Sequence, residues 1–66
     1  MQPHQQRVVD EKKDLDEKLS KLEVFIYESP VFSTLDGNEQ YRLRKQSGTM
    51  KDYSRILGER IAAFKD

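Results

Sequence analysis

The chain has 66 residues, no cysteine and one histidine, and its twelve basic and twelve acidic side chains leave no net charge. This length allows one domain at most, and a domain of this size buries only about 60% of the surface that its unfolded chain exposes. Without cysteine, neither a disulfide framework nor a thiolate zinc site is possible, and one histidine does not make a metal site. Oligomerisation is the remaining way to stabilise so small a fold.

Composition also limits the partners. Charged residues make up 36% of the chain and apolar residues 35%. No apolar run approaches the roughly 18 residues of a membrane span, and no signal-peptide core is present, which predicts a cytoplasmic protein. A general nucleic-acid binder normally carries a strong basic excess, which this chain lacks. We therefore expect neither a membrane nor a long nucleic acid among its partners.

A long helix is predicted over residues 3–28. Proline at the first helical position is favourable because its missing N–H would be unpaired there. Lys12 fills a gap in the apolar stripe of this segment, where its aliphatic stem can lie along the seam. Ser29-Pro30 then ends the helix, since proline disfavours helical geometry in the preceding residue. The apolar residues recur at helical spacing and make one face of the helix apolar: Val8, Leu15, Leu19, Leu22 and Ile26.

A single helical turn is predicted over residues 30–35, with Val31, Phe32 and Leu35 pointing back into the end of a hairpin. The run from Asp36 to Glu39 has the spacing of a capping box, which starts the last helix.

The last helix carries apolar residues every seven positions, a pattern typical of helices packed nearly parallel or antiparallel. Gly48 is its weak point and predicts a kink or a close contact. The repeat consists of Leu43, Met50, Leu57 and Phe64.

Two helices of nearly equal length, joined by a short turn, predict an all-α antiparallel hairpin that occupies residues 1–66 as a single domain. A hairpin has one seam and no second layer. Apolar residues such as Val9, Phe25, Ile56 and Phe64 would therefore stay exposed on a monomer. Another protomer can cover them, so we expect a homo-oligomer.

The sequence does not predict an enzyme. It contains no nucleophile motif, no glycine-rich phosphate loop and no histidine at a mechanistic spacing from a carboxylate. General acid–base catalysis needs a walled pocket that excludes water, which one hairpin cannot build. We expect a binding protein with no cofactor and with no catalytic or metal-binding residues.

One candidate anion site lies on the first helix. His4 is either an exposed, frayed residue or an aromatic platform at a helix N-terminus, where anions are favoured, and Arg7 lies one turn on. Lys18, Ser20 and Lys21 lie several turns further along the same helix. Helices from different protomers, packed antiparallel, could bring these groups together as base-stacking and phosphate-binding residues.

A second candidate is a basic set on the last helix, interleaved with Tyr41 and Tyr53. It is either a solvated basic face or an anion or nucleotide patch. Further on, Gly58-Glu59-Arg60 combines a glycine that allows close approach with an arginine capable of bidentate binding. The basic set consists of Arg42, Arg44, Lys45, Lys51 and Arg55.

Several runs, spread over nearly the whole chain, carry a family resemblance. They are His4-Gln5-Gln6-Arg7-Val8-Val9-Asp10-Glu11-Lys12, Leu15-Asp16-Glu17-Lys18, Phe25-Ile26, Ser29-Pro30-Val31-Phe32, Tyr53-Ser54 and Ile56-Leu57-Gly58-Glu59-Arg60-Ile61. With these runs the chain resembles the anti-CBASS sponges, small phage proteins that sequester the cyclic nucleotide signals of bacterial immunity.

The resemblance implies a compact homohexamer of helical hairpins, acting in the cytoplasm of an infected bacterium. It implies pockets between protomers that bind cyclic dinucleotides without cleaving them. The family's pocket lysine corresponds to Lys18 and its hydroxyl residue to Ser20, while its stacking aromatic falls at or beside His4. A separate cyclic-trinucleotide site near the symmetry axis would contain Arg60 and Tyr53.

Two other functions remain open from the residues. One is a helical protein-interaction module that binds or inhibits a host or phage protein, marked by an apolar stripe left uncovered in the homo-oligomer. The other is a nucleic-acid accessory protein that uses the basic residues of 42–55, which the absence of net charge disfavours.

Overall fold

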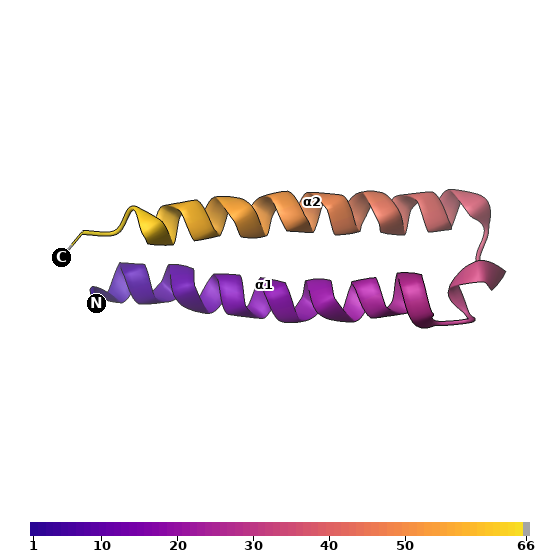
Figure 1. Cartoon of the computed structure of the whole chain (residues 1–66), viewed down its shortest axis with the longest axis horizontal. Coiled ribbons are helices and arrows are strands. Elements are labelled where there is room, and N and C mark those ends of the chain that lie inside the picture. Colours follow the sequence, from indigo (N-terminus) through magenta and orange to yellow (C-terminus); the bar gives the residue numbers. More distant parts are fainter. Residues whose placement is uncertain (66) are drawn as a thin grey trace.

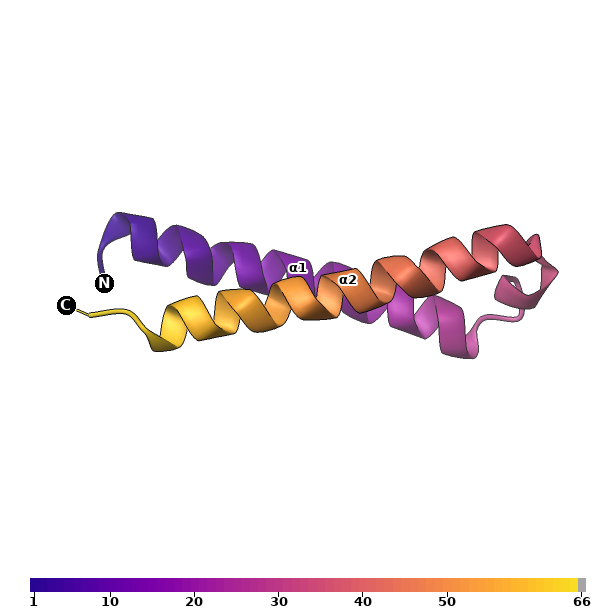
Figure 2. The ribbon, with the colours of Figure 1, turned by 90° about the horizontal axis from the view of Figure 1, so that it is seen from above.

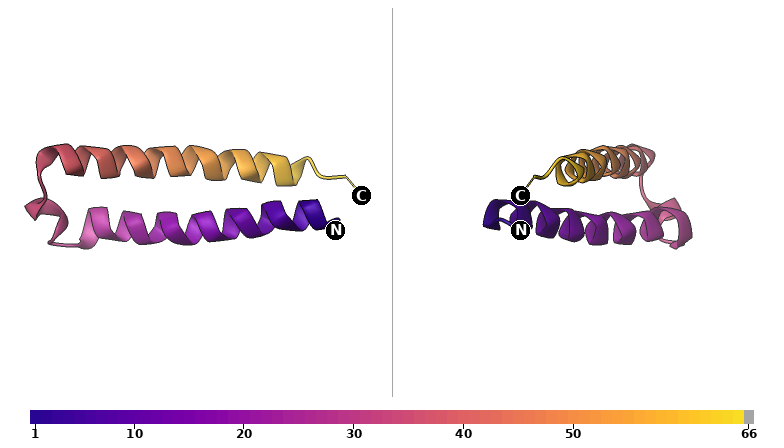
Figure 3. Two further views of the ribbon diagram at one scale, coloured as in Figure 1. Left: turned by 180° about the vertical axis from the view of Figure 1, so that it is seen from behind. Right: turned by 60° about the vertical axis from the view of Figure 1, so that its left-hand side comes forward.

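The computed structural model describes residues 1–65, which form two long helices joined by a short turn (Figure 1). Helix α1 spans Pro3–Glu28 and helix α2 spans Gly37–Ala62, with a single-turn 3-10 helix, η1, at Phe32–Thr34. The helices run side by side in opposite directions, so the start of α1 and the end of α2 lie at the same end of the hairpin (Figure 3). From above, the two helices cross near their middles (Figure 2). The predicted all-α antiparallel hairpin is confirmed.

The seam between the helices follows a seven-residue repeat on both. Positions alternate in steps of three and four, which keeps one stripe of each helix against its partner. Leu57 in this seam is fully buried, and Lys12 occupies the seam position predicted for it. The buried and partly buried seam residues are Gln5, Val8, Lys12, Leu15, Leu19, Leu22 and Ile26 on α1, and Gln40, Leu43, Ser47, Met50, Ser54, Leu57, Ile61 and Phe64 near or on α2.

Polar contacts close the open end of the hairpin. The side-chain oxygen of Gln5 accepts a hydrogen bond from the backbone N–H of Gln2 at 2.8 Å. The side-chain nitrogen of the same residue donates to the carbonyl oxygen of Lys65 at 3.0 Å. Gln5 is only 4% exposed, and both ends of its amide are satisfied. One side chain therefore ties the start of α1 to the segment that follows α2.

The turn packs around one aromatic residue. Phe32 is buried, its ring meets that of Phe25 edge-on at 6.0 Å between centroids, and the Arg44 guanidinium lies 5.0 Å over it. Leu35 is partly buried, but Val31 is 53% exposed, so its predicted inward orientation is wrong. A 3-10 turn has three residues per turn, which aligns Phe32 with Leu35 and directs Val31 elsewhere.

The start of α2 also differs from the prediction. The Asp36 side chain makes no capping hydrogen bond, and Glu39 instead pairs with Arg42 at 2.8 Å, so the capping box is absent. The side chain of Gln40 reaches back to the carbonyl oxygen of Leu35 at 2.9 Å. Intrahelical ion pairing and this backward amide contact have replaced the reciprocal cap.

Two further expectations for the helices are corrected or refined. Helix α2 is continuous through Gly48, and no neighbouring atom lies within 4 Å of the point where its Cβ would stand, so neither a kink nor a close contact is found. Ile56 is 47% exposed as expected, whereas Val9, Phe25 and Phe64 are partly buried by the hairpin itself. Within the described chain, no helix is long and apolar enough to cross a membrane.

Candidate functional site

Two open grooves run along the hairpin, one on each side of the seam. We call the first the Lys18 groove; its volume is about 450 Å³. Its lining comes mostly from α1, with one aromatic residue from α2. The lining residues are Arg7, Asp10, Glu11, Asp14, Leu15, Lys18 and Tyr53.

The Lys18 groove brings together three of the residues singled out from the sequence. Arg7 and Lys18 come from α1, and the antiparallel course of α2 places Tyr53 beside them. Neither cation forms an ion pair with any residue in 1–65. Tyr53 is 41% exposed, so its ring is accessible. Free cations beside an accessible ring can bind a phosphate and stack a base.

Three more predicted residues lie on the same flank. His4 and Lys18 are two seven-residue steps apart, as are Arg7 and Lys21, and such steps keep side chains in one row of a helix in a coiled coil. Arg60 follows Tyr53 by seven residues and lies toward the start of α1 because the helices are antiparallel. His4, Lys21 and Arg60 are all exposed. Residues expected in two separate nucleotide sites therefore lie along one flank, spread over several helical turns: His4, Arg7, Lys18, Lys21, Tyr53 and Arg60.

Ser20 is the exception. It follows Lys18 by two residues, which places it about 200° around the helix axis, on the other side of α1. Ser20 is exposed there. One hairpin therefore does not bring its hydroxyl to the lysine with which the resemblance pairs it.

Carboxylates limit what one groove can hold. Asp10, Glu11 and Asp14 line the Lys18 groove and outnumber its two cations, so its lining has a net charge of −1. An anionic ligand in a single groove would meet more negative than positive charge. No group of three or more metal-binding side chains occurs among residues 1–65.

The basic set on α2 is mostly neutralised within the hairpin. Lys51 pairs with Glu23 of α1 at 3.3 Å, and Arg55 pairs with Glu59 at 3.1 Å. Arg42 pairs with Glu39, and Arg44 lies over the Phe32 ring. Lys45 alone of the set has no such partner among the described residues. This arrangement supports the interpretation of the set as a solvated helix face.

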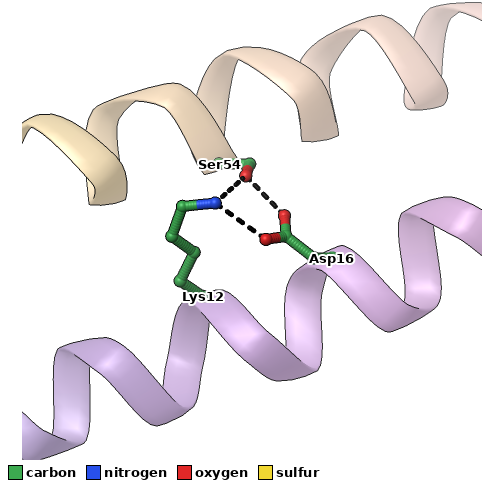
Figure 4. A network of polar contacts seen from close by, with 3 residues as sticks. All are labelled: Lys12, Asp16 and Ser54. Carbon is green, nitrogen blue, oxygen red and sulfur yellow. Dashed lines mark hydrogen bonds and ion pairs between the residues drawn. The ribbon is translucent and has the colours of Figure 1, made fainter.

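A polar network inside the seam was not foreseen from the sequence. The Lys12 ammonium donates to Asp16 at 2.7 Å and, across the seam, to the Ser54 hydroxyl oxygen at 3.0 Å (Figure 4). The Ser54 hydroxyl donates in turn to the other Asp16 oxygen at 2.5 Å. The hydrogen bonds from Lys12 and then Ser54 lower the pKa of Asp16 below its ordinary value of 3.8. The repeat that places Ser54 seven residues before Ile61 was a signal for this contact.

The chain is an antiparallel hairpin, and one flank exposes cations and an aromatic ring. These features place it in the class of small helical binding proteins. A family model described as Sequestin matches residues 2–63, so the chain belongs to the Sequestin family. This match confirms the family resemblance seen in the sequence, and the family's name denotes sequestration, a binding role rather than catalysis. No curated protein and no solved structure matched the chain.

Proposed function

We propose that this protein binds cyclic oligonucleotide second messengers, both cyclic dinucleotides and cyclic trinucleotides, and sequesters them without cleavage. As a phage-encoded protein in an infected bacterium, it would thereby block CBASS signalling. Two facts support the proposal. The chain belongs to a family named for sequestration, and one flank of its hairpin exposes an aromatic ring and cations that form no ion pair within residues 1–65.

The observation that carries the proposal is the position of Tyr53 between α1 cations that have no partner in the described chain. A cyclic dinucleotide is a compact dianion with two flat bases. Its phosphates suit Arg7 and Lys18, and a base suits the exposed face of the Tyr53 ring. Groups held on two packed helices need little reordering on binding, which favours tight binding without turnover.

A homo-oligomer belongs to the proposal for two reasons. The Lys18 groove has a net negative lining, so cations from a neighbouring protomer have to complete an anion pocket. Ser20 lies on the opposite side of α1 from Lys18, so a pocket that uses both residues draws them from different protomers. The resemblance implies that six hairpins assemble.

Calorimetric titration with a panel of cyclic di- and trinucleotides tests the proposal. We expect submicromolar binding, with the ligand recovered intact by chromatography. Lys18→Ala should weaken binding by about tenfold or more, because a charge-assisted hydrogen bond to phosphate is lost. Lys45→Ala is the matched control: Lys45 is also exposed and unpaired within residues 1–65, but it does not line the Lys18 groove.

The outcomes separate the candidate functions. Equal affinity for the Lys18→Ala and Lys45→Ala variants would remove the Lys18 groove from the proposal. A folded protein that binds no member of the panel would favour the alternative of a protein-interaction module.

A further inference from the structure

The second groove lies on the other side of the seam from the Lys18 groove. We call it the Lys13 groove; its volume is about 460 Å³. Gly58 leaves room beside it, since a Cβ at that residue would contact the end of the Lys12 side chain at 3.4 Å. Lys12 and Asp16 neutralise each other at 2.7 Å. The lining residues are Val9, Lys12, Lys13, Asp16, Glu17 and Ile61.

The two remaining charges of the Lys13 groove are self-complementary. Lys13 and Glu17 are exposed, stand one turn apart on α1, and form no ion pair with any residue of the described chain. When two such helices meet antiparallel about a two-fold axis, each lysine faces the glutamate of the other helix. Two identical surfaces then supply two reciprocal ion pairs.

The same register covers the apolar end of the groove. With Lys13 opposite Glu17 of a second copy, Val9 lies at the same height along the helix as Lys21 of that copy. Val24 is one helical turn from residue 21 and is 51% exposed on the isolated hairpin. Its side chain therefore comes within a turn of the partly buried pair Val9 and Ile61. Apolar contact and charge pairing point to the same arrangement.

We propose that the Lys13 groove is a two-fold self-association surface, occupied by α1 of a second copy of this chain. Reciprocal pairs between Lys13 and Glu17 fix the antiparallel orientation, and Val24 of each copy covers the Val9 end of the other. This surface leaves the Lys18 groove of each hairpin uncovered on the opposite flank. The proposal rests on the self-association included in the proposed function but on no ligand.

Charge reversal tests this surface, with mass measured by light scattering and sedimentation in the absence of nucleotide. Wild-type protein should have at least twice the 7.8 kDa mass of one chain. Lys13→Glu and Glu17→Lys should each lower the mass, with dissociation at least about tenfold stronger, because each reversal places like charges together twice. The double variant carrying both reversals should regain the wild-type mass.

Mixing the two single variants provides the sharpest readout. One then carries glutamates at both positions and the other carries lysines, so a two-fold interface forms between unlike copies although neither variant associates with itself. Lys45→Glu, a reversal on an exposed residue outside the groove, should leave the mass unchanged. Circular dichroism of each variant checks that the helices remain.

Three results would overturn the proposal. They are a wild-type protein that is monomeric at tens of micromolar, single reversals that keep the wild-type mass, and reversals whose loss neither mixing nor the double variant restores. Failure to bind cyclic nucleotides, with these mass changes intact, would instead count against the proposed ligand alone.

Discussion

The ammonium group of Lys12 lies 3.0 Å from the hydroxyl oxygen of Ser54, across the seam between α1 and α2. A cation at a seam position is costly unless it is paired and hydrogen-bonded. Here Asp16 pairs with it, and Ser54 bonds to both charged groups. Among the described residues, every buried side-chain nitrogen and oxygen has a hydrogen-bond partner. The seam is therefore mixed, with apolar packing and one satisfied polar network.

The first prediction concerns acid stability. Hydrogen bonds from Lys12 and Ser54 favour the ionised form of Asp16, so its pKa is lower in the folded than in the unfolded protein. A group with a lowered pKa stabilises the fold above its unfolded pKa, and that contribution disappears as the pH falls through its folded pKa. Asp16→Asn should therefore destabilise the protein at neutral pH and flatten the loss of stability below about pH 4.

Urea unfolding at a series of pH values measures this effect. Asp52→Asn is the control, because Asp52 is 75% exposed and its only ion pair within residues 1–65, to Arg55, is 3.9 Å long. Parallel pH profiles for the two variants would show that the Asp16 network contributes nothing specific.

The second prediction concerns the centre of the core. Leu57 is fully buried against Val8 and Leu15, and few other apolar side chains are buried in the core of so small a protein. Leu57→Ala should lower the free energy of unfolding by about 2–5 kcal/mol, enough to unfold much of a marginal domain. Val31→Ala, at a residue of the turn that is 53% exposed and takes no part in the seam, should cost clearly less. Thermal unfolding at equal protein concentration compares the two, and equal losses would contradict the single-seam core.

Periodicity made the helices and their pairing predictable. Leu57 and Met50 recur seven residues apart, and this spacing alone identifies the stripe of α2 that faces α1. The same register also contains Ser47 and Ser54, whose burial could have been foreseen had the repeat been extended to polar residues. Val31 and Asp36 were misjudged because the geometry of a turn and of a cap depends on local dihedral angles that periodicity does not determine.

The candidate site was predictable only in part. Spacing along one helix relates His4 to Lys18. That Lys18 and Tyr53 line the same groove depends instead on the register between the two helices. The acidic lining of that groove was missed because Asp14 and Glu11 read as ordinary solvated residues when one helix is considered by itself. Whether cations from another protomer offset them depends on the assembly, which helix periodicity does not specify.

The third prediction concerns the ends of the hairpin. Gln5→Met keeps the side-chain size but removes both hydrogen bonds of the buried amide, so the first turn of α1 and the segment before Lys65 should both fray. Gln5→Glu separates the two contacts. Its carboxylate can still accept from the Gln2 N–H, but it cannot donate to the Lys65 carbonyl.

Amide hydrogen exchange followed by NMR resolves these ends. In Gln5→Glu we expect faster exchange at residues 63–64 with near-normal protection in the first turn of α1; in Gln5→Met we expect both ends to exchange faster. Equal acceleration at both ends in the glutamate variant would show that Gln5 does not act through two separable contacts.

The last prediction compares two glycines inside α2. Gly48 has open space where a Cβ would stand, so Gly48→Ala should stabilise the protein by about 1 kcal/mol through helix propensity alone. Gly58→Ala offers the same propensity gain, but its Cβ would meet Lys12 Cε at 3.4 Å, at the short end of ordinary contact distances. Because Asp16 and Ser54 hold that side chain in place, part of the gain should be lost. Urea unfolding of both variants measures the difference, and equal stabilisation would show that a methyl group at residue 58 fits beside Lys12 without cost.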